Sequence, residues 1–211
     1  MFYPPSEIDH PDYYAEPNIK IIDDFLSHEE LIKYQNFLSG DWTLGPTIEN
    51  FKYLSRDLYN HYQWNNDWSD VRWLDDVPCE WEQLYDQIAV HLPPHRIHWV
   101  DLKITSPLST GTPMHRDKDP WRNANDSTKF SKAWTVICNL NSQWHPSWGG
   151  ALIAHQAVKR HDGTTSYIEK QRIPITPGQL IVGENFYHSI QPVTEPERHR
   201  ISLIVHVLQY K

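Results

Sequence analysis

The sequence predicts a mainly β protein, in which two sheets form a sandwich or barrel and two helices pack on one outer face. Three observations support this prediction. Short runs rich in Val, Ile, Leu and Trp fill the chain after residue 94, clusters of Gly, Pro, Asn and Ser separate these runs, and two segments of helical periodicity precede them.

Composition limits the domain organisation and the partners. The 211 residues show no break in composition, so we expect one domain over 1–211, with an arm and supporting helices in 1–95 and a β core in 96–208. Lys and Arg total 19 against 27 Asp and Glu, and the net charge of −8 gives no electrostatic reason to hold a nucleic acid.

The expected setting is a reducing cytoplasm. The chain has two cysteines and opens without a charged and then apolar leader. No apolar run approaches the ~18 residues of a membrane span, so a membrane is not an expected partner. Cys79 and Cys138 lack the spacing of a zinc site and are interpreted as small buried residues.

The first half of the chain predicts an arm and two helices. The first 18 residues are rich in Pro and acidic side chains and lack periodicity, which indicates an extended arm laid over the domain. Ser27 and Glu30 have the spacing of a capping box, and an apolar stripe at helical spacing follows them. A second helix is predicted at 79–91, and the intervening segment 42–78 is interpreted as loop with short strands.

The second half predicts strands. Each run is short, rich in β-branched and other apolar residues, and bounded by turn-forming residues. The predicted strands are 96–104, 132–140, 150–155, 179–183 and 199–208.

Three polar side chains in this β region have the residue types of an iron site. His115 and Asp117 lie two apart after a strand, so strand alternation would point both into one cavity. His188 lies near the end of the next-to-last β run and could complete the set. Two neutral imidazoles and one carboxylate leave three adjacent positions of an octahedral Fe(II) open, which is the arrangement of non-haem iron oxygenases.

Arg200 and Ser202 form a second polar pair, at the start of the last strand and on one face of it. A guanidinium fork beside a hydroxyl suits a carboxylate held inside a barrel. The formal charges of Fe(II), Asp117, Arg200 and a bound dicarboxylate cancel, and a neutral set is easier to bury.

With these residues in this order, the sequence resembles the 2-oxoglutarate- and Fe(II)-dependent oxygenases, and within them the prolyl-4-hydroxylase-like branch. The resemblance covers residues 96–208, and "IIDDFLSHEEL" also looks like the first strand and helix of that branch. The other matching segments are Gly149-Gly150 in "GGALIA" and "IPITPGQLIVGENFYHSIQPV", which is similar to the family's turn, strand and distal-histidine segment.

The resemblance implies a double-stranded β-helix of the jelly-roll or cupin-like type. It also implies that His115, Asp117 and His188 bind Fe(II), and that Arg200, with Ser202, binds the distal carboxylate of 2-oxoglutarate. The implied reaction consumes O2 and 2-oxoglutarate, releases succinate and carbon dioxide, and hydroxylates an unactivated C–H bond, for example in a prolyl or other residue of a peptide.

The sequence departs from that branch at one position. Members often carry a tyrosine shortly before the first iron ligand that helps to hold the co-substrate, but no Tyr lies between Trp99 and His115. Trp99, Lys103, Thr135 and Asn139 are the possible substitutes, and the sequence does not choose among them.

Two loops that follow the iron motif, 118–132 and 141–150, are expected at the mouth of the barrel. Their aromatic and basic residues are predicted to line the substrate entrance. These residues are Trp121, Arg122, Trp144 and Trp148.

Three other functions compete with a peptide hydroxylase. A hydroxylase of a small free metabolite is the nearest alternative, and a closed pocket with a second cation would favour it over an open aromatic groove. A nucleobase-repair oxygenase is disfavoured by the acidic charge. A non-catalytic β-barrel binding module would have no physical need to keep the iron and Arg200 residues.

The other histidines of the β region are interpreted as hydrogen-bonding residues, namely His145, His155, His161, His199 and His206.

Overall fold

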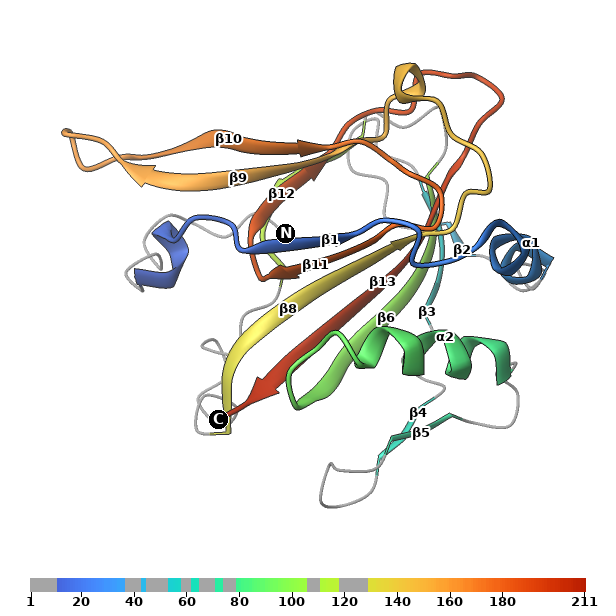
Figure 1. Cartoon of the computed structure of the whole chain (residues 1–211). Coiled ribbons are helices and arrows are strands. Elements are labelled where there is room, and N and C mark those ends of the chain that lie inside the picture. Colours follow the sequence, from blue (N-terminus) through green and yellow to red (C-terminus); the bar gives the residue numbers. More distant parts are fainter. Residues whose placement is uncertain are drawn as a thin grey trace.

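The larger of two antiparallel sheets forms the centre of the fold (Figure 1). The computed structural model describes residues 11–36, 43–44, 53–57, 62–64, 71–73, 79–105, 111–117 and 129–211. The strand order is β1-β11-β8-β13-β6-β3-β2. The strands are β1 (Ile19–Ile22), β2 (Thr43–Leu44), β3 (Tyr53–Asp57), β6 (His95–Thr105), β8 (Phe130–Asn139), β11 (Leu180–Glu184) and β13 (Arg200–Tyr210).

The smaller sheet has four strands in the order β10-β9-β12-β7. They are β7 (Thr112–His115), β9 (Leu152–Lys159), β10 (Thr165–Ile173) and β12 (Tyr187–Ile190). β9 and β10 continue beyond the rest of the sheet as a long hairpin (Figure 1). Two further strands, β4 (Tyr62–Trp64) and β5 (Val71–Trp73), pair with each other.

A first hydrophobic core lies between the two sheets. Ile137 of β8 and Ile181 of β11 contribute from the larger sheet, and Leu152 of β9 and Ile190 of β12 contribute from the smaller one. All four side chains are buried. The two sheets therefore form the predicted sandwich, with its inner faces packed against each other.

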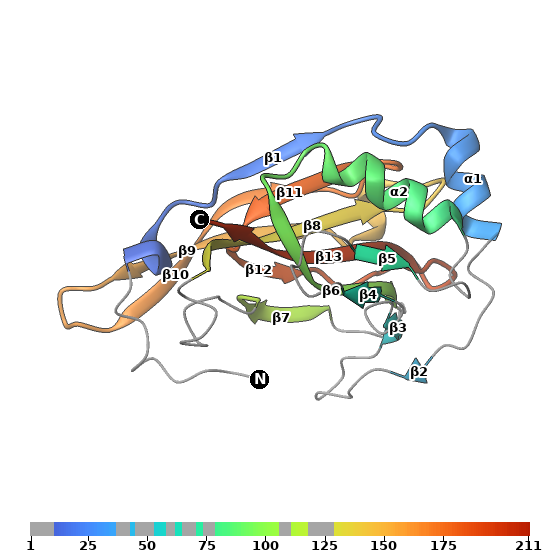
Figure 2. The same cartoon turned by 90° about the horizontal axis from the view of Figure 1, so that it is seen from below.

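A second core lies on the outer face of the larger sheet, where α1 (His28–Asn36) and α2 (Cys79–Ala89) cover the strands (Figure 2). Leu31 of α1 and Leu84 of α2 pack with residues of β8 and β13, among them Val136 and Val205. Because strand residues alternate between faces, the same strands present their other side chains to the smaller sheet. The prediction of helices on one outer face is confirmed.

The start of α1 has the predicted capping box. The backbone N–H of Glu30 donates to Oγ of Ser27 at 3.2 Å, and Oε2 of Glu30 accepts from the backbone N–H of Ser27 at 2.8 Å. These two bonds satisfy donors that the first turn of a helix leaves unpaired. The backbone N–H of Ser27, and the hydroxyl of Ser27, which also donates to Oε2 at 2.8 Å, lower the pKa of Glu30, because the ionised carboxylate is the better acceptor.

Residues 11–18, called the arm below, lie over the smaller sheet. The arm starts with the 3₁₀ helix Pro11–Tyr14. Nε2 of Gln156 in β9 donates to the carbonyl of Tyr14 at 2.9 Å, and the backbone N–H of Glu184 donates to the carbonyl of Asn18 at 3.1 Å. These bonds fasten the arm at two places, Tyr14 and Asn18. The rest of the predicted N-terminal arm, residues 1–10, lies outside the described residues.

Two differences from the sequence interpretation concern β10 and β7. β10 was not predicted because most of its side chains are exposed, so it carries no apolar alternation. β7 has four residues, which is too short for a periodic signal.

Within the described ranges, no helix has the length and apolar character needed to cross a bilayer.

Candidate metal centre

β7 and β12 bring two histidines face to face. The strands are antiparallel, and His115 is the register partner of His188, with 4.3 Å between the ring centroids. Asp117 follows two residues past the end of β7, and one donor atom from each of the three residues lies within 4.8 Å of the other two. The predicted iron ligands therefore come together, and no other such group of His, Cys, Asp and Glu occurs in the part of the chain described.

Backbone carbonyls fix the tautomers of both histidines. Nδ1 of His115 lies 2.8 Å from the carbonyl oxygen of Pro113, and Nδ1 of His188 lies 3.0 Å from that of Phe186. A carbonyl only accepts, so each Nδ1 carries a proton, and in the neutral form of either ring the lone pair lies on Nε2. Burial lowers the pKa of His188 to about 4, and the neighbouring His115 contributes, so this ring is neutral at neutral pH.

Asp117 stays ionised at the centre of the cluster. Burial raises the pKa of its carboxyl, but the neighbouring His206 and His188 lower it by more, and the pKa lies well below its usual range. Oγ1 of Thr135 donates to Oδ2 at 2.7 Å. Oδ1, which lies 3.5 Å from Nε2 of His115, is left to face a metal.

His206 is a contact of this centre that the sequence interpretation missed. The residue is buried, and its Nδ1 lies 3.4 Å from Oδ2 of Asp117. His206 occupies β13 at the same parity as Arg200 and Ser202, and its register partner in β8 is Thr135. That parity was a usable signal, because it places His206 on the inner face of the same strand.

Arg200 and Ser202 lie buried on that inner face, with exposed fractions of 2% and 0%. Burial lowers the pKa of Arg200 to about 10, so the guanidinium remains charged at neutral pH. Nε of Arg200 and Oγ of Ser202 have no hydrogen-bond partner, and Arg200 has no ion pair, among the residues described. A buried cation without an anion is costly, so this arrangement is suited to an anionic ligand.

The donor set fits the cofactors that the sequence resemblance implies. Two imidazoles that can each present an Nε2 lone pair, together with one carboxylate, are the ligands of a facial Fe(II) site with open positions. The unpaired polar atoms of Arg200 and Ser202 are hydrogen-bond donors on the interior face of the same sandwich, as a carboxylate ligand requires.

The structure narrows the four possible substitutes for the missing tyrosine. The hydroxyl of Thr135 already donates to Asp117. Asn139 and Lys103 are the register partners of Ser202 on its two sides, in β8 and β6. Asn139 is buried, and its Oδ1 has no partner within the described chain. The side chain of Trp99 lies outside what the structure describes.

Two of the four predicted entrance residues can be placed. The rings of Trp144 and Trp148 meet edge to face at 5.6 Å, and both side chains are half-buried. Gly150 has a φ of 74°, and a Cβ there would lie 3.2 Å from the Trp144 ring and 3.5 Å from Cδ of Arg200. Trp144 therefore lies close to Arg200 across a glycine. Trp121 and Arg122 lie outside the described residues.

Comparisons with known proteins agree with this geometry. Residues 106–207 match the family described as the 2OG-Fe(II) oxygenase superfamily. No curated protein matches the chain.

Solved structures share the fold at low sequence identity. The epimerase SnoN from nogalamycin biosynthesis, described as non-heme and alpha ketoglutarate dependent, has a TM-score of 0.61 and 11% identity over 94% of this chain and 80% of its own. A prolyl-4-hydroxylase from Pseudomonas putida has a TM-score of 0.54 and 15% identity over 94% and 96%. A prolyl hydroxylase from Trichoplax adhaerens has a TM-score of 0.56 and 14% identity over 90% and 83%. The sandwich is thus the double-stranded β-helix that the sequence predicted.

Proposed function

We propose that this chain, of which residues 106–207 match the 2OG-Fe(II) oxygenase superfamily, is an oxygenase of that kind that hydroxylates an unactivated C–H bond in a peptide. The enzyme uses Fe(II), held by His115, Asp117 and His188, together with 2-oxoglutarate. The observation that carries the proposal is the position of these three ligands in the same interior as Arg200, which is buried, charged and without an ion pair among the described residues.

In this proposal Arg200 and Ser202 hold the distal carboxylate of 2-oxoglutarate. The guanidinium can donate two parallel hydrogen bonds to a carboxylate, and the hydroxyl of Ser202 can add a third. Gly150 supports this assignment, because a side chain at that position would reach the stem of Arg200 and the ring of Trp144. The charges of the metal, Asp117, Arg200 and the dicarboxylate then balance inside the sandwich.

The residues of the chain have positioning roles in such a reaction. Bound iron would supply the oxidising chemistry with 2-oxoglutarate and O2 as co-substrates, with one oxygen atom of O2 entering succinate, the other entering the hydroxylated product, and carbon dioxide being released. His115 and His188 present neutral Nε2 atoms, and Thr135 holds the second oxygen of Asp117 so that the carboxylate keeps one orientation. The buried walls of the sandwich keep water from the reacting atoms.

A peptide substrate is supported by the half-buried aromatic pair near Arg200. Trp144 and Trp148 form this pair, and the guanidinium of Arg198 lies 4.8 Å from the Trp148 ring. We assign both Trp residues, with Trp121 and Arg122, to the substrate entrance. The Trichoplax adhaerens enzyme is described in complex with a peptide fragment, which is consistent with this assignment by analogy of fold.

A small free metabolite is the second candidate substrate. The observation that favours it is the likeness to SnoN and SnoK, which are described as enzymes of nogalamycin biosynthesis and have TM-scores of 0.61 and 0.63. The same fold therefore serves small molecules as well as peptides.

One experiment separates the two candidates. Fe(II)-loaded protein is incubated aerobically with 2-oxoglutarate and either a peptide library or a pool of small metabolites, and succinate is measured together with the mass gain of one oxygen in the products. Oxygen added to a peptide, and lost in an Asp117→Ala control, supports the proposal. Oxygen added to a metabolite alone contradicts the peptide proposal and supports the second candidate substrate.

A Trp144→Ala variant with full activity would remove that residue from the entrance.

A further inference from the structure

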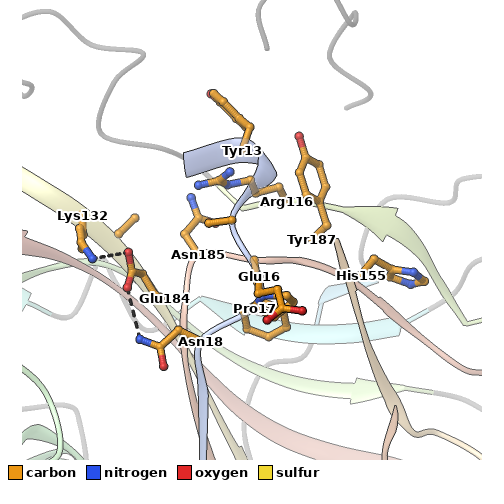
Figure 3. A pocket seen from close by; sticks show the side chains of 13 residues that line it. Tyr13, Glu16, Pro17, Asn18, Arg116, Lys132, His155, Glu184, Asn185 and Tyr187 are labelled. Carbon is orange, nitrogen blue, oxygen red and sulfur yellow. Dashed lines mark hydrogen bonds and ion pairs between the residues drawn. The ribbon is translucent and has the colours of Figure 1, made fainter. Parts of the chain in front are cut away.

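The side chain of Arg116 lies near the rings of two tyrosines, Tyr13 and Tyr187 (Figure 3). Its guanidinium carbon is 4.4 Å from the ring centroid of Tyr13 and 5.7 Å from that of Tyr187. In the sequence Arg116 stands between the iron ligands His115 and Asp117. Because successive residues of an extended segment point to opposite sides, Arg116 points outward where its neighbours point inward.

The two tyrosines come from separate elements, and both are held in place. Tyr187 belongs to β12 and meets the ring of Tyr167 in β10 edge to face at 4.8 Å. Tyr13 belongs to the arm and is 8% exposed. Side-chain contacts thus run from β10 and β12 to the arm by way of Arg116, the residue between two iron ligands. We call this series the stack; its members are Tyr167, Tyr187, Arg116 and Tyr13.

A cavity of about 260 Å³ lies under the arm at this place. Arg116, Tyr13 and Tyr187 line it, together with Lys132 and Glu184, whose charges pair at 2.6 Å (Figure 3). None of the three iron ligands lines the cavity. The stack therefore lies outside the group of iron ligands, and it is connected to them through the backbone, by Arg116 to His115 and Asp117 and by Tyr187 to His188.

We propose that Tyr13 and Tyr187 are positioning residues, which clamp Arg116 and thereby fix His115 and Asp117 in the geometry that binds Fe(II). β7 ends at His115, so Asp117 lies beyond the last residue of the strand ladder. The clamp supplies an anchor on the outer side at this point. A ligand that folding has already ordered costs less to order when the metal binds, so the clamp raises metal affinity.

This inference rests on the iron-binding role of the triad and is independent of the substrate. Positioning of the metal ligands by Tyr13 also differs from a general role of the arm in stability. The chain offers a matched control that distinguishes these two roles. Tyr14, the next residue of the arm, has the same kind of contact with Lys159 of β9, whose Nζ lies 5.2 Å from the ring centroid. Tyr14→Ala removes a cation–π contact of the arm, whereas Tyr13→Ala removes the one made to Arg116.

The test is anaerobic titration of the metal-free full chain with Fe(II), and with Co(II) as a spectroscopic substitute, for the parent and the variants Tyr13→Ala, Tyr13→Phe and Tyr14→Ala. We expect Tyr13→Ala to weaken metal binding about three- to tenfold. Tyr13→Phe keeps the ring and should restore the parent affinity, and Tyr14→Ala should leave it unchanged. Equal effects of Tyr13→Ala and Tyr14→Ala, or no effect of either, would overturn the proposal.

A second variant tests the proposal even if Tyr13→Ala fails to fold. Arg116→Met keeps the length and apolar contact of the side chain but removes the charge, and it should weaken metal binding to a similar extent. In the double variant Tyr13→Ala/Arg116→Met, the losses of metal affinity should not add, because both substitutions remove the same contact between Tyr13 and Arg116. Additive effects would contradict the clamp. A parent protein that binds no Fe(II) would instead contradict the iron site itself, so the two failures are distinguishable.

Discussion

His188 faces His115 across the ladder of β7 and β12, and each ring donates its Nδ1 proton to a backbone carbonyl two residues earlier in the chain. Both Nε2 atoms are thereby directed to the same space before any metal arrives. The site is prepared by strand register and local hydrogen bonds.

Replacement of His188 by Ala should abolish specific iron binding. The variant loses one of three protein ligands, and we expect a loss of more than about 100-fold in affinity, beyond the 10- to 100-fold typical of residues that only support a ligand. Absorption titration with Co(II) measures this directly. His155→Ala is the matched control, because His155 bonds to Ser189 and lies outside the triad. Unchanged affinity in His188→Ala would remove this residue from the metal site.

Thr135→Val should weaken metal binding while leaving the shape of the site intact. Valine has nearly the same volume as threonine but cannot donate the 2.7 Å hydrogen bond to Asp117. The carboxylate then loses the donor that selects its orientation, and we expect affinity to fall about tenfold. Thr135→Ser keeps the hydroxyl and should bind metal like the parent. If Val and Ser variants bind equally well, the hydroxyl does not orient Asp117.

Arg200→Gln should weaken binding of 2-oxoglutarate without weakening binding of Fe(II). Removal of one partner of a buried charge pair costs about 2–5 kcal/mol, which corresponds to at least about 30-fold in the dissociation constant. The measurement is anaerobic titration of the Fe(II)-loaded protein with 2-oxoglutarate, followed through the visible charge-transfer band. Ser202→Ala should have a smaller effect of a few-fold, since it removes a single neutral donor. Parent-like affinity in Arg200→Gln would refute the assignment of the distal carboxylate.

The metal-free protein should lose stability as the pH falls from about 6.5 to about 4. Burial lowers the pKa of His188 from 6.5 to about 4 in the folded state, so in this range the unfolded chain binds a proton that the folded chain does not. The loss from this residue reaches about 3 kcal/mol. Asp117 acts only at lower pH, because its pKa is lowered too and its stabilisation disappears as the pH falls through that lower value.

Chemical denaturation at several pH values, in the parent and in His188→Asn, checks this prediction. Asparagine does not titrate, so the variant should show a flatter dependence over the same range. The pKa values of His91, His95 and His155 are also lowered, but these residues are present in both proteins and cancel in the comparison. Parallel curves for the two proteins would show that His188 is not the titrating group.

Much of the site could be predicted from sequence because its residues lie close to strand ends with clear patterns. His115 and Asp117 are near neighbours along the chain, and the run before Arg200 and Ser202 has the turn residues that begin a strand. The prediction needed only alternation and order along the chain, and the structure confirms that the three iron ligands meet.

The contacts that Thr135, His206 and Tyr13 make could not be predicted in that way, although alternation does place His206 on the inner face of its strand. Thr135 and His206 approach Asp117 because β8 and β13 pair in one particular register, and register depends on packing rather than on either strand alone. Tyr13 meets Arg116 across 103 positions of sequence separation, a contact that exists only once the arm is in place. β10 escaped prediction for a different reason, since an exposed edge strand has no apolar side to reveal it.

The two faces of β13 have different tasks, one in stability and the other in the site. Leu203, Val205 and Val207 belong to the core beneath the helices, while Ser202 and His206 occupy the opposite face with the site. In a library of single substitutions along this strand, a screen for protein abundance would deplete variants at one set of alternating positions, and a screen for turnover would deplete both sets. The positions lost in the second screen alone would mark, from a list of variants without any coordinates, the side of the strand on which the chemistry takes place.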